Sequence, residues 1–115
     1  MKSLYQRWQK TEVEEALTIR RVVLLVGPRQ CGKTTLAKEF VSKNVSYLTL
    51  DDITYRDAAE TDPQNFVKHQ LKTMIIDEIQ RVPTLLMSIK KVVDENPQPG
   101  QFLLTGSSNI QALPN

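Results

Sequence analysis

The segment from Val22 to Lys38, VVLLVGPRQCGKTTLAK, decides the fold. It opens with Val22 to Val26, an apolar run of strand length with both faces apolar, as in a strand buried within a parallel sheet. From Lys33 to Lys43 the apolar residues recur at helical spacing, at Leu36, Ala37, Phe40 and Val41. The segment therefore predicts a buried strand, a glycine-containing loop and an amphipathic helix, in that order.

The loop between this strand and helix matches a phosphate-binding pattern. Gly27 to Thr34, GPRQCGKT, fits G-x-x-x-x-G-K-[ST] without a mismatch. The two glycines let the backbone curl so that its N–H groups point at phosphate oxygens, and the helix that follows adds its positive dipole end. Lys33 supplies a mobile positive charge for the β- and γ-phosphates, and the Thr34 hydroxyl is a hard oxygen ligand for Mg²⁺.

The nucleotide-binding residues expected from this pattern are Gly27, Pro28, Arg29, Gln30, Cys31, Gly32, Lys33, Thr34 and Thr35. We expect Lys33 to face solvent at the phosphate site and to assist catalysis as well. We interpret Cys31 as a small residue that fits the loop, in preference to a redox-sensitive thiol. For Arg29 both a phosphate contact and a solvated side chain stay open.

A second strand carries two acids at its end. Thr73 to Glu78, TMIIDE, is an apolar run followed by Asp77 and Glu78. An acid at the end of a strand beside the phosphate loop can reach Mg²⁺, usually through water, and we assign that role to Asp77. Glu78 can orient and deprotonate an attacking water, which favours an ATPase over a kinase.

Other polar residues follow the remaining strands. Ser107 comes after Gln101 to Leu104 and is the candidate to sense the γ-phosphate or hold the water, although Thr105 and Ser108 compete for that role. Asp51 and Asp52 end another strand, and we expect them to lie too far from the phosphate loop and to act as turn and cap residues. His69 is expected to be a solvated side chain.

The rest of the chain alternates strands with helices. Strands are expected at Val45 to Leu50, Met74 to Ile76 and Gln101 to Leu104. Helices are expected within Leu4 to Arg20, in two pieces within Ile53 to Leu71 with Asp62-Pro63 starting the second, and after Pro83. This alternation predicts an α/β fold, a parallel sheet with flanking helices joined by right-handed crossovers.

Composition places few other constraints on function. The chain has 115 residues, a formal net charge of +2 and one cysteine. Its basic residues are interleaved with acids, so charge alone indicates neither a nucleic-acid partner nor an anionic membrane surface. The single cysteine excludes an internal disulfide, and no segment approaches the about 20 apolar residues that span a bilayer. We therefore expect a cytoplasmic protein with no membrane partner.

Four stretches together resemble a known family. They are VLLVGPRQCGKTTLAK at Val23 to Lys38, LTLDD at Leu48 to Asp52, IIDEIQRVP at Ile75 to Pro83, and QFLLTGSS at Gln101 to Ser108. In this order they resemble predicted AAA+-type P-loop ATPases whose full-length members carry a C-terminal domain of unknown function. The loop and the acidic string together are far more specific than either motif by itself.

The resemblance implies a P-loop NTPase with an AAA+-like sheet in the order 5-1-4-3-2, ATP and Mg²⁺ as cofactors, and Ser107 at the first sensor position. Strand 5 and the region beyond it are missing from the sequence. We therefore expect residues 1–21 to form an N-terminal helical segment, and residues 22–115 to form an ATPase core truncated at its C-terminal end. An unpaired edge on the strand from Val22 to Val26 would favour self-association.

The leading hypothesis is an ATPase module that binds Mg-ATP and hydrolyses the γ-phosphate. The alternative is a truncated remnant that binds nucleotide without turnover. A third hypothesis is a small P-loop kinase, but the sequence shows no motif that would bind a phosphoryl acceptor. No guanine-specific Asn-Lys-x-Asp motif occurs in the sequence, which favours adenine. The biological process, and whether the partner is protein or nucleic acid, stay open at this stage.

Overall fold

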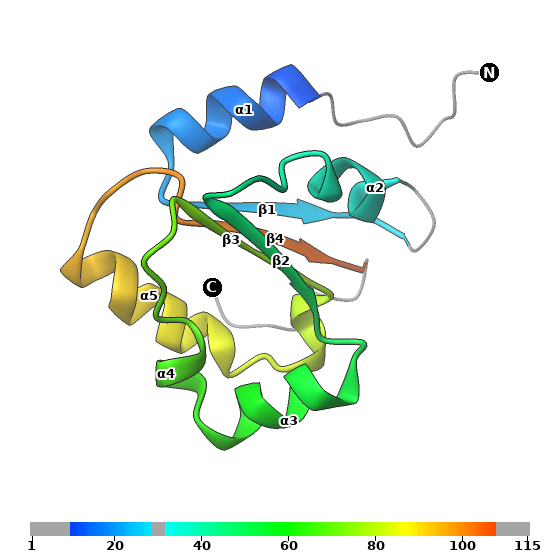
Figure 1. Ribbon diagram of the computed structural model, residues 1–115, viewed down its shortest axis with the longest axis vertical. Helices are drawn as coiled ribbons and strands as arrows, with labels where there is room; N and C mark the ends of the chain where they lie inside the picture. Colours follow the sequence, from blue (N-terminus) through cyan, green and yellow to red (C-terminus); the bar gives the residue numbers. More distant parts are fainter. Residues whose placement is uncertain (1–9, 29–31, 108–115) are drawn as a thin grey trace.

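Four parallel strands form the centre of the structure, a computed structural model that describes residues 10–28 and 32–107 (Figure 1). The strands are β1 (Val22–Val26), β2 (Val45–Thr49), β3 (Thr73–Asp77) and β4 (Phe102–Gly106). They lie in the order β1-β4-β3-β2, and every pairing is parallel. The α/β class and the order 1-4-3-2 are therefore confirmed.

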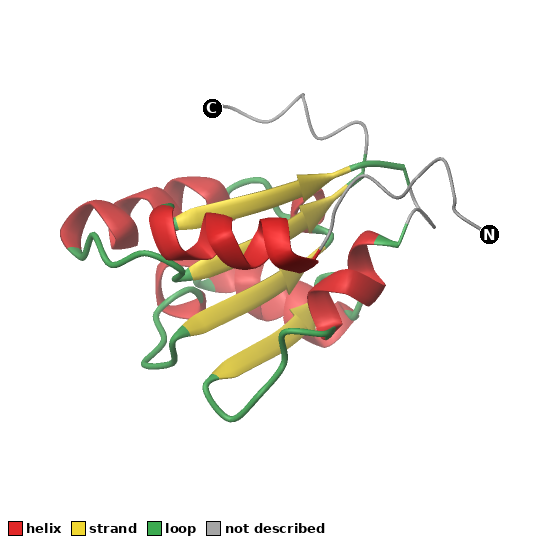
Figure 2. Ribbon diagram, turned by 90° about the horizontal axis from the view of Figure 1, so that it is seen from above, coloured by secondary structure: helices red, strands yellow, loops and turns green. Residues whose placement is uncertain are grey.

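Helices cover both faces of this sheet. The helices are α1 (Lys10–Ile19), α2 (Lys33–Lys38), α3 (Ile53–Thr61), α4 (Pro63–Phe66) and α5 (Leu85–Glu95), with a short 3-10 helix η1 (Ile79–Arg81). Figure 1 shows α1 and α2 on one side of the sheet and α3, α4 and α5 on the other. Seen from above in Figure 2, the strand arrows all point toward the same edge of the sheet. Parallel strands joined by helices give this three-layer arrangement.

Two hydrophobic cores hold the layers together, because successive strand residues point to opposite faces. On the face of α3, α4 and α5, Met74, Ile76, Phe102 and Leu104 pack in one cluster with Leu85, Ile89 and other residues of those helices and their loops. On the face of α1 and α2, a second cluster holds Val13, Val23, Leu25, Ala37, Val45, Ile75 and Leu103. Asp77 alternates with Ile76 and so faces the α2 side of the sheet.

Helix α2 is shorter than its apolar spacing predicts. It ends at Lys38, five residues before the expected end at Lys43. Beyond it the amide of Phe40 bonds the carbonyl of Ala37, a tight i→i−3 turn. Ser42 and Val45 then exchange both backbone hydrogen bonds across a short turn, which redirects the chain into β2. The apolar residues after Lys38 therefore belong to a turn.

The start of α4 follows its sequence signal. Pro63 is the first residue of the helix, and the Asp62 carboxylate accepts a hydrogen bond of 3.2 Å from the amide of Asn65. Asp52 caps α3 in the same way, because its carboxylate accepts from the amide of Thr54 at 2.9 Å. Both aspartates satisfy amides that the first helical turn leaves without a partner.

The interpretation of His69 as a solvated side chain is wrong. The ring is half-buried, and its edge packs against Phe102 with the ring centroids 5.1 Å apart. The amide of Leu71 donates to Nδ1 at 3.2 Å, so Nε2 carries the proton and donates to the carbonyl of Gln101 at 3.1 Å. Burial lowers the pKa of His69, because a buried imidazolium loses its hydration. His69 therefore links the loop after α4 to the start of β4.

Gly100 ties the entry of β4 to the end of α1. Its amide donates to the carbonyl of Arg20 at 2.8 Å, and its φ is +76°. A Cβ atom at this position would lie 2.8 Å from the carbonyl oxygen of Leu17. Only glycine combines this left-handed backbone with so close an approach to the helix.

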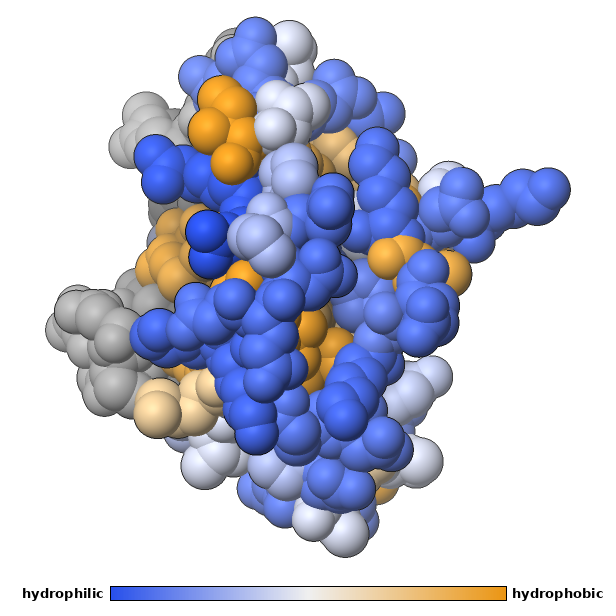
Figure 3. Space-filling view, turned by 90° about the vertical axis from the view of Figure 1, so that its left-hand side faces the viewer, coloured by the Kyte–Doolittle hydropathy of each residue, from blue (hydrophilic) through white to orange (hydrophobic). Residues whose placement is uncertain are grey.

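The surface seen in Figure 3 is mainly hydrophilic, and its hydrophobic residues form separate patches. Among the helices within residues 10–28 and 32–107, none combines the length and apolar character needed to cross a bilayer.

Candidate functional site

A cavity of about 250 Å³ lies between the start of α2 and the carboxyl ends of β2 and β3. Its described lining residues are Gly32, Lys33, Thr34, Thr35, Asp51, Asp77 and Glu78. Parallel α/β sheets bind ligands at this edge. The structure thus brings the loop residues and the acidic pair together around one space, as the sequence predicts.

The described ends of the phosphate-loop motif have the geometry that the motif requires. The amide of Gly27 continues the β1–β4 pairing by donating to the carbonyl of Gly106 at 3.2 Å. Gly32 has a φ of +94°, in the left-handed region that glycine adopts without strain, and α2 begins directly after it. Arg29, Gln30 and Cys31 lie outside the described residues.

Lys33 does not face solvent as expected, since only 2% of it is exposed. Its Nζ donates to the carbonyl of Pro28 at 3.3 Å, so the side chain extends toward the residues that follow β1. A lysine is almost never buried to this degree without a partner for its charge. The ammonium group is thus held by the Pro28 carbonyl, beside the cavity.

The carboxylate of Asp77 accepts three side-chain hydroxyl hydrogen bonds. Thr34 Oγ1 donates to Oδ1 at 2.9 Å, and Thr105 Oγ1 makes a short hydrogen bond to the same oxygen. Tyr47 donates to Oδ2 at 2.9 Å. Asp77 is itself 4% exposed, so both oxygens are held in fixed directions inside the protein. The aspartate of β3 and the threonine of α2 are therefore neighbours, as the motif pairing predicts.

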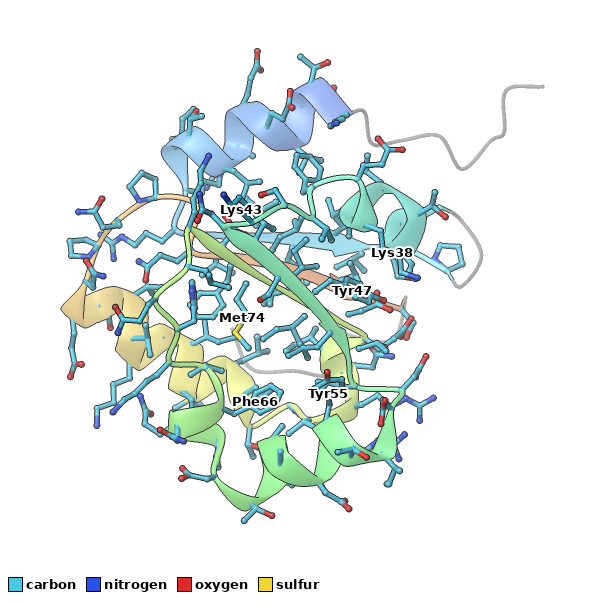
Figure 4. The ribbon with its side chains drawn as sticks, in the orientation of Figure 1. Lys38, Lys43, Tyr47, Tyr55, Phe66 and Met74 are labelled. Atoms are coloured by element: carbon cyan, nitrogen blue, oxygen red, sulfur yellow. The ribbon has the colours of Figure 1, made fainter. Side chains whose placement is uncertain are left out.

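Tyr47 is a site residue that the sequence did not reveal. It lies on β2 opposite Ile75, on the same face of the sheet as Asp77, and its side chain reaches forward along the strand. The Nζ of Lys38 lies 5.2 Å from the centre of the phenol ring (Figure 4). Burial raises the pKa of Tyr47, and the hydrogen bond to Asp77 raises it further, so the phenol stays a donor.

Glu78 stands in an unusual backbone conformation. Its φ is 62°, and no other non-glycine residue in the described part of the chain has a positive φ. Its amide donates to Thr105 Oγ1 at 3.0 Å, and only 3% of the residue is exposed. Gln80 Nε2 donates to Glu78 Oε1 at 2.6 Å. Left-handed conformations of this kind cost about 1–2 kcal/mol per residue and gather at functional sites.

The residues at the end of β4 differ in their surroundings. Thr105 is fully buried, and its hydroxyl is already engaged by Asp77 and by the Glu78 amide. Ser107 is half-buried, and its amide donates to Gln80 Oε1 at 3.3 Å. Ser108 lies outside the described residues. The two described candidates for a γ-phosphate sensor are Thr105 and Ser107. The Thr105 hydroxyl already bonds Asp77 and the Glu78 amide.

The expectation that Asp51 lies far from the phosphate loop is wrong, since Asp51 lines the cavity. The physical reason is that α2 crosses over the sheet, so that Thr34 meets β3 instead of staying above β1. β3 is the direct neighbour of β2, and the amide of Leu50 bonds the carbonyl of Asp77 at 2.9 Å. Asp51 is fixed there by Arg81, whose Nε lies 2.7 Å from Oδ1.

The oxygen donors at this site suit one particular class of metal. The Thr34 hydroxyl and the Asp77 carboxylate are adjacent hard ligands, which Mg²⁺ prefers. In the described parts of the chain no three His, Cys, Asp or Glu residues form a group able to hold a metal. Mg²⁺ is usually bound by one or two protein oxygens, with phosphates and water completing its octahedron. The residues present therefore fit Mg²⁺ bound together with a phosphate ligand.

Comparison with known proteins gives a family match over most of the chain. The model of a family described as "AAA domain" matches residues 19–115. Two uncharacterized mycobacterial proteins, Rv2008c of Mycobacterium tuberculosis and Mb2031c of Mycobacterium bovis, are each 38% identical over 98 residues. The match takes in 84% of this chain and 22% of each relative, so the chain spans about a fifth of their length.

Two solved structures share the fold at low sequence identity. A crystal structure of a DNA replication initiation factor aligns with a TM-score of 0.59 and 16% identity, over 92% of this chain and 39% of that one. The replication initiator DnaA bound to AMPPCP and single-stranded DNA aligns with a TM-score of 0.57 and 17% identity, over the same shares. Similarity at this level of identity shows the arrangement of strands and helices alone.

Proposed function

The chain belongs to the AAA domain family of P-loop ATPases, and from this premise we propose that it binds Mg-ATP and hydrolyses the γ-phosphate. The observation that carries the proposal is the hydrogen bond of 2.9 Å between Thr34 and Asp77. It joins the end of the phosphate-loop motif to the first acid of β3. The same cavity holds the buried Lys33 and Glu78.

In the proposed complex the loop holds the phosphates. Backbone N–H groups and side chains of the loop, from Gly27 and Pro28 through Arg29, Gln30, Cys31 and Gly32 to Lys33, Thr34 and Thr35, surround the phosphate chain. Lys33 exchanges the carbonyl of Pro28 for phosphate oxygens, which are stronger acceptors for an ammonium group. The Gly32 conformation supports this role, because it turns the backbone into the loop just before α2.

Magnesium would be held by Thr34 directly and by Asp77 through water. When bound, the metal would offset the negative charge of the β- and γ-phosphates. Asp77 keeps its orientation because Tyr47 and Thr105 fix the carboxylate from two sides. Ligand carboxylates that are oriented by such partners bind metal more tightly than free ones.

For hydrolysis, Glu78 is the proposed base. Its carboxylate takes the proton of a water molecule while the water oxygen forms a bond to the γ-phosphorus, and the bond from that phosphorus to the bridging oxygen of ADP breaks. Lys33 stabilises the charge that collects on the phosphate oxygens. Ser107, at the end of β4, is the proposed contact to the γ-phosphate or to the attacking water.

The phosphate assignment can be tested with Lys33→Met, which removes the charge and keeps much of the aliphatic bulk of the buried side chain. Fluorescent-nucleotide titration should show that ATP affinity falls by at least tenfold. Circular dichroism and thermal unfolding should show a fold close to the wild type. Lys43→Met, which alters an exposed lysine in the turn before β2, is the matched control. Unchanged ATP affinity in Lys33→Met contradicts the assignment.

Turnover can be tested separately from binding. Glu78→Gln keeps the shape of the side chain and cannot accept the proton, so Mg-ATP should bind while phosphate release falls by about 10²-fold or more. Release at the wild-type rate in this variant excludes Glu78 as the base. If the wild-type chain binds ATP and releases no phosphate, the alternative hypothesis is correct, and the chain binds nucleotide without turnover.

A further inference from the structure

We propose that Gln80 is a positioning residue that holds the carboxylate of Glu78 and links it to the end of β4. The inference rests on the proposed function, in which Glu78 is the base. Gln80 lies in η1, two residues after Glu78, and it is half-buried. It is not among the residues that line the cavity, so it would act on the reaction through Glu78.

The direction of each hydrogen bond orients the Gln80 amide. The backbone N–H of Ser107 can only donate, and it lies 3.3 Å from Gln80 Oε1. The NH₂ end of the same amide therefore faces Glu78, and Nε2 donates to Oε1 at 2.6 Å. A carboxylate accepts at two oxygens, so engaging Oε1 fixes the group and leaves Oε2 as the oxygen to receive a proton.

Contacts hold Glu78 both at its backbone and at its carboxylate, in a backbone conformation that is uncommon. The left-handed conformation, with φ 62° and ψ 52°, is one that side-chain-bearing residues rarely adopt. Thr105 holds the Glu78 amide, and Gln80 holds the carboxylate. Both contacts connect Glu78 to the end of β4, since Thr105 lies in the strand and Ser107, which bonds Gln80, directly follows it. The end of β4 therefore fixes Glu78 at two points.

A purely structural role is the competing explanation, in which Gln80 only ties η1 to β4. The two roles make opposite predictions for Gln80→Glu. Glutamate has nearly the same shape and still accepts from the Ser107 amide, so a structural tie would survive. It cannot donate to Glu78 while ionised, and it places a second negative charge beside the first, which disfavours the working geometry.

The experiment measures phosphate release and Mg-ATP binding for the wild type, Gln80→Glu and Gln80→Ala. We expect kcat to fall by about tenfold or more in both variants, while KM and the Kd for Mg-ATP stay within about twofold. Gln80→Glu should be at least as impaired as Gln80→Ala. Gln70→Glu adds the same charge at an exposed position outside the site and should behave as the wild type.

Binding of a transition-state analogue supplies a readout that needs no turnover. ADP with aluminium fluoride imitates the transferring phosphoryl group, whereas AMPPCP imitates bound ATP. Both Gln80 variants should bind the ADP–aluminium fluoride complex about tenfold more weakly and AMPPCP with unchanged affinity. An unchanged ratio of the two affinities overturns the inference.

Two results separate this inference from the proposed function. If Gln80→Glu matches the wild type and only Gln80→Ala is impaired, Gln80 is a structural tie and the inference is wrong, while Glu78 can still be the base. If Glu78→Gln releases phosphate at the wild-type rate, the proposed base is wrong, and a positioning role toward it is overturned as well.

Discussion

Tyr47 donates a hydrogen bond of 2.9 Å to the Oδ2 atom of Asp77, from the strand next to the one that ends in that aspartate. The other carboxylate oxygen is held by Thr34 and Thr105. Tyr47 is thus the partner that fixes the side of Asp77 turned toward β2. The phenol is itself held by Lys38, which lies over its ring.

We predict that Tyr47→Phe weakens magnesium-dependent ATP binding by about tenfold, because partners that orient a metal ligand contribute on that scale. The change removes one oxygen and keeps the ring that packs beneath Lys38. The measurement is a Mg²⁺ titration at fixed fluorescent ATP analogue. Tyr55→Phe is the matched control, since Tyr55 is 41% exposed on α3. Equal Mg²⁺ midpoints in the two variants would show that the phenol does not support the metal site.

Thr105→Val should destabilise the fold by about 1–3 kcal/mol, since it leaves the buried Asp77 carboxylate and the Glu78 amide each short of a hydrogen bond. Valine keeps the shape and removes only the hydroxyl function. The free energy of unfolding from urea titration is the measured quantity. Thr105→Ser retains the hydroxyl and should recover most of the loss. A Thr105→Val variant as stable as the wild type would mean that this hydroxyl contributes nothing net.

The stability of the fold should depend on pH through His69. Burial lowers its folded-state pKa below the ordinary value of 6.5, so the unfolded chain takes up the proton first as pH falls. The contribution of neutral His69 to the free energy of unfolding is fully present above about pH 6.5. It is lost as the pH falls from there through the lowered folded-state pKa. Urea titrations of the wild type and His69→Gln across this range test the idea. The wild type should lose stability more steeply than the variant, and identical slopes would contradict the prediction.

Gly100→Ala should cost about 2 kcal/mol or more of unfolding free energy. The positive φ alone disfavours alanine by about 1–2 kcal/mol, and the new Cβ would lie 2.8 Å from the Leu17 carbonyl oxygen. Thermal and urea unfolding measure the effect. Gln98→Ala changes an exposed residue of the same loop and should stay within about 0.5 kcal/mol of the wild type. Equal free energies of unfolding in the two variants would show that the loop adapts to the added carbon.

The architecture could be predicted from local patterns along the chain. The apolar run of β1 and the two acids at the end of β3 are recognisable from consecutive residues, and the structure places Thr34 and Asp77 together as their motifs imply. Alternation of strands and helices gave the parallel sheet. The exact end of α2 was missed, since the turn formed by Ser42 and Val45 depends on pairing rather than on helical spacing.

The supporting residues of the site could not be predicted in the same way. Tyr47 reaches Asp77 only because of the register between β2 and β3, and Asp51 borders the cavity only because α2 crosses the sheet. Gln80 depends on the left-handed turn at Glu78, which no residue pattern signals. Each of these contacts depends on tertiary structure, so the spacing of residues in the sequence does not predict it.

The pairing of β1 with β4 has a consequence for the order in which the chain folds during synthesis. Val22 pairs with Phe102, 80 positions later, so β1 is made long before the strand that it adjoins. At about 5–20 residues per second a ribosome needs about 4–16 seconds to add those residues. Throughout that interval the apolar segment VVLLV lacks β4, its partner in the described sheet, and is a target for chaperones that bind exposed hydrophobic strands. Gly27, whose amide bonds the carbonyl of Gly106 directly after β1, consequently reaches its final position only when β4 has been made.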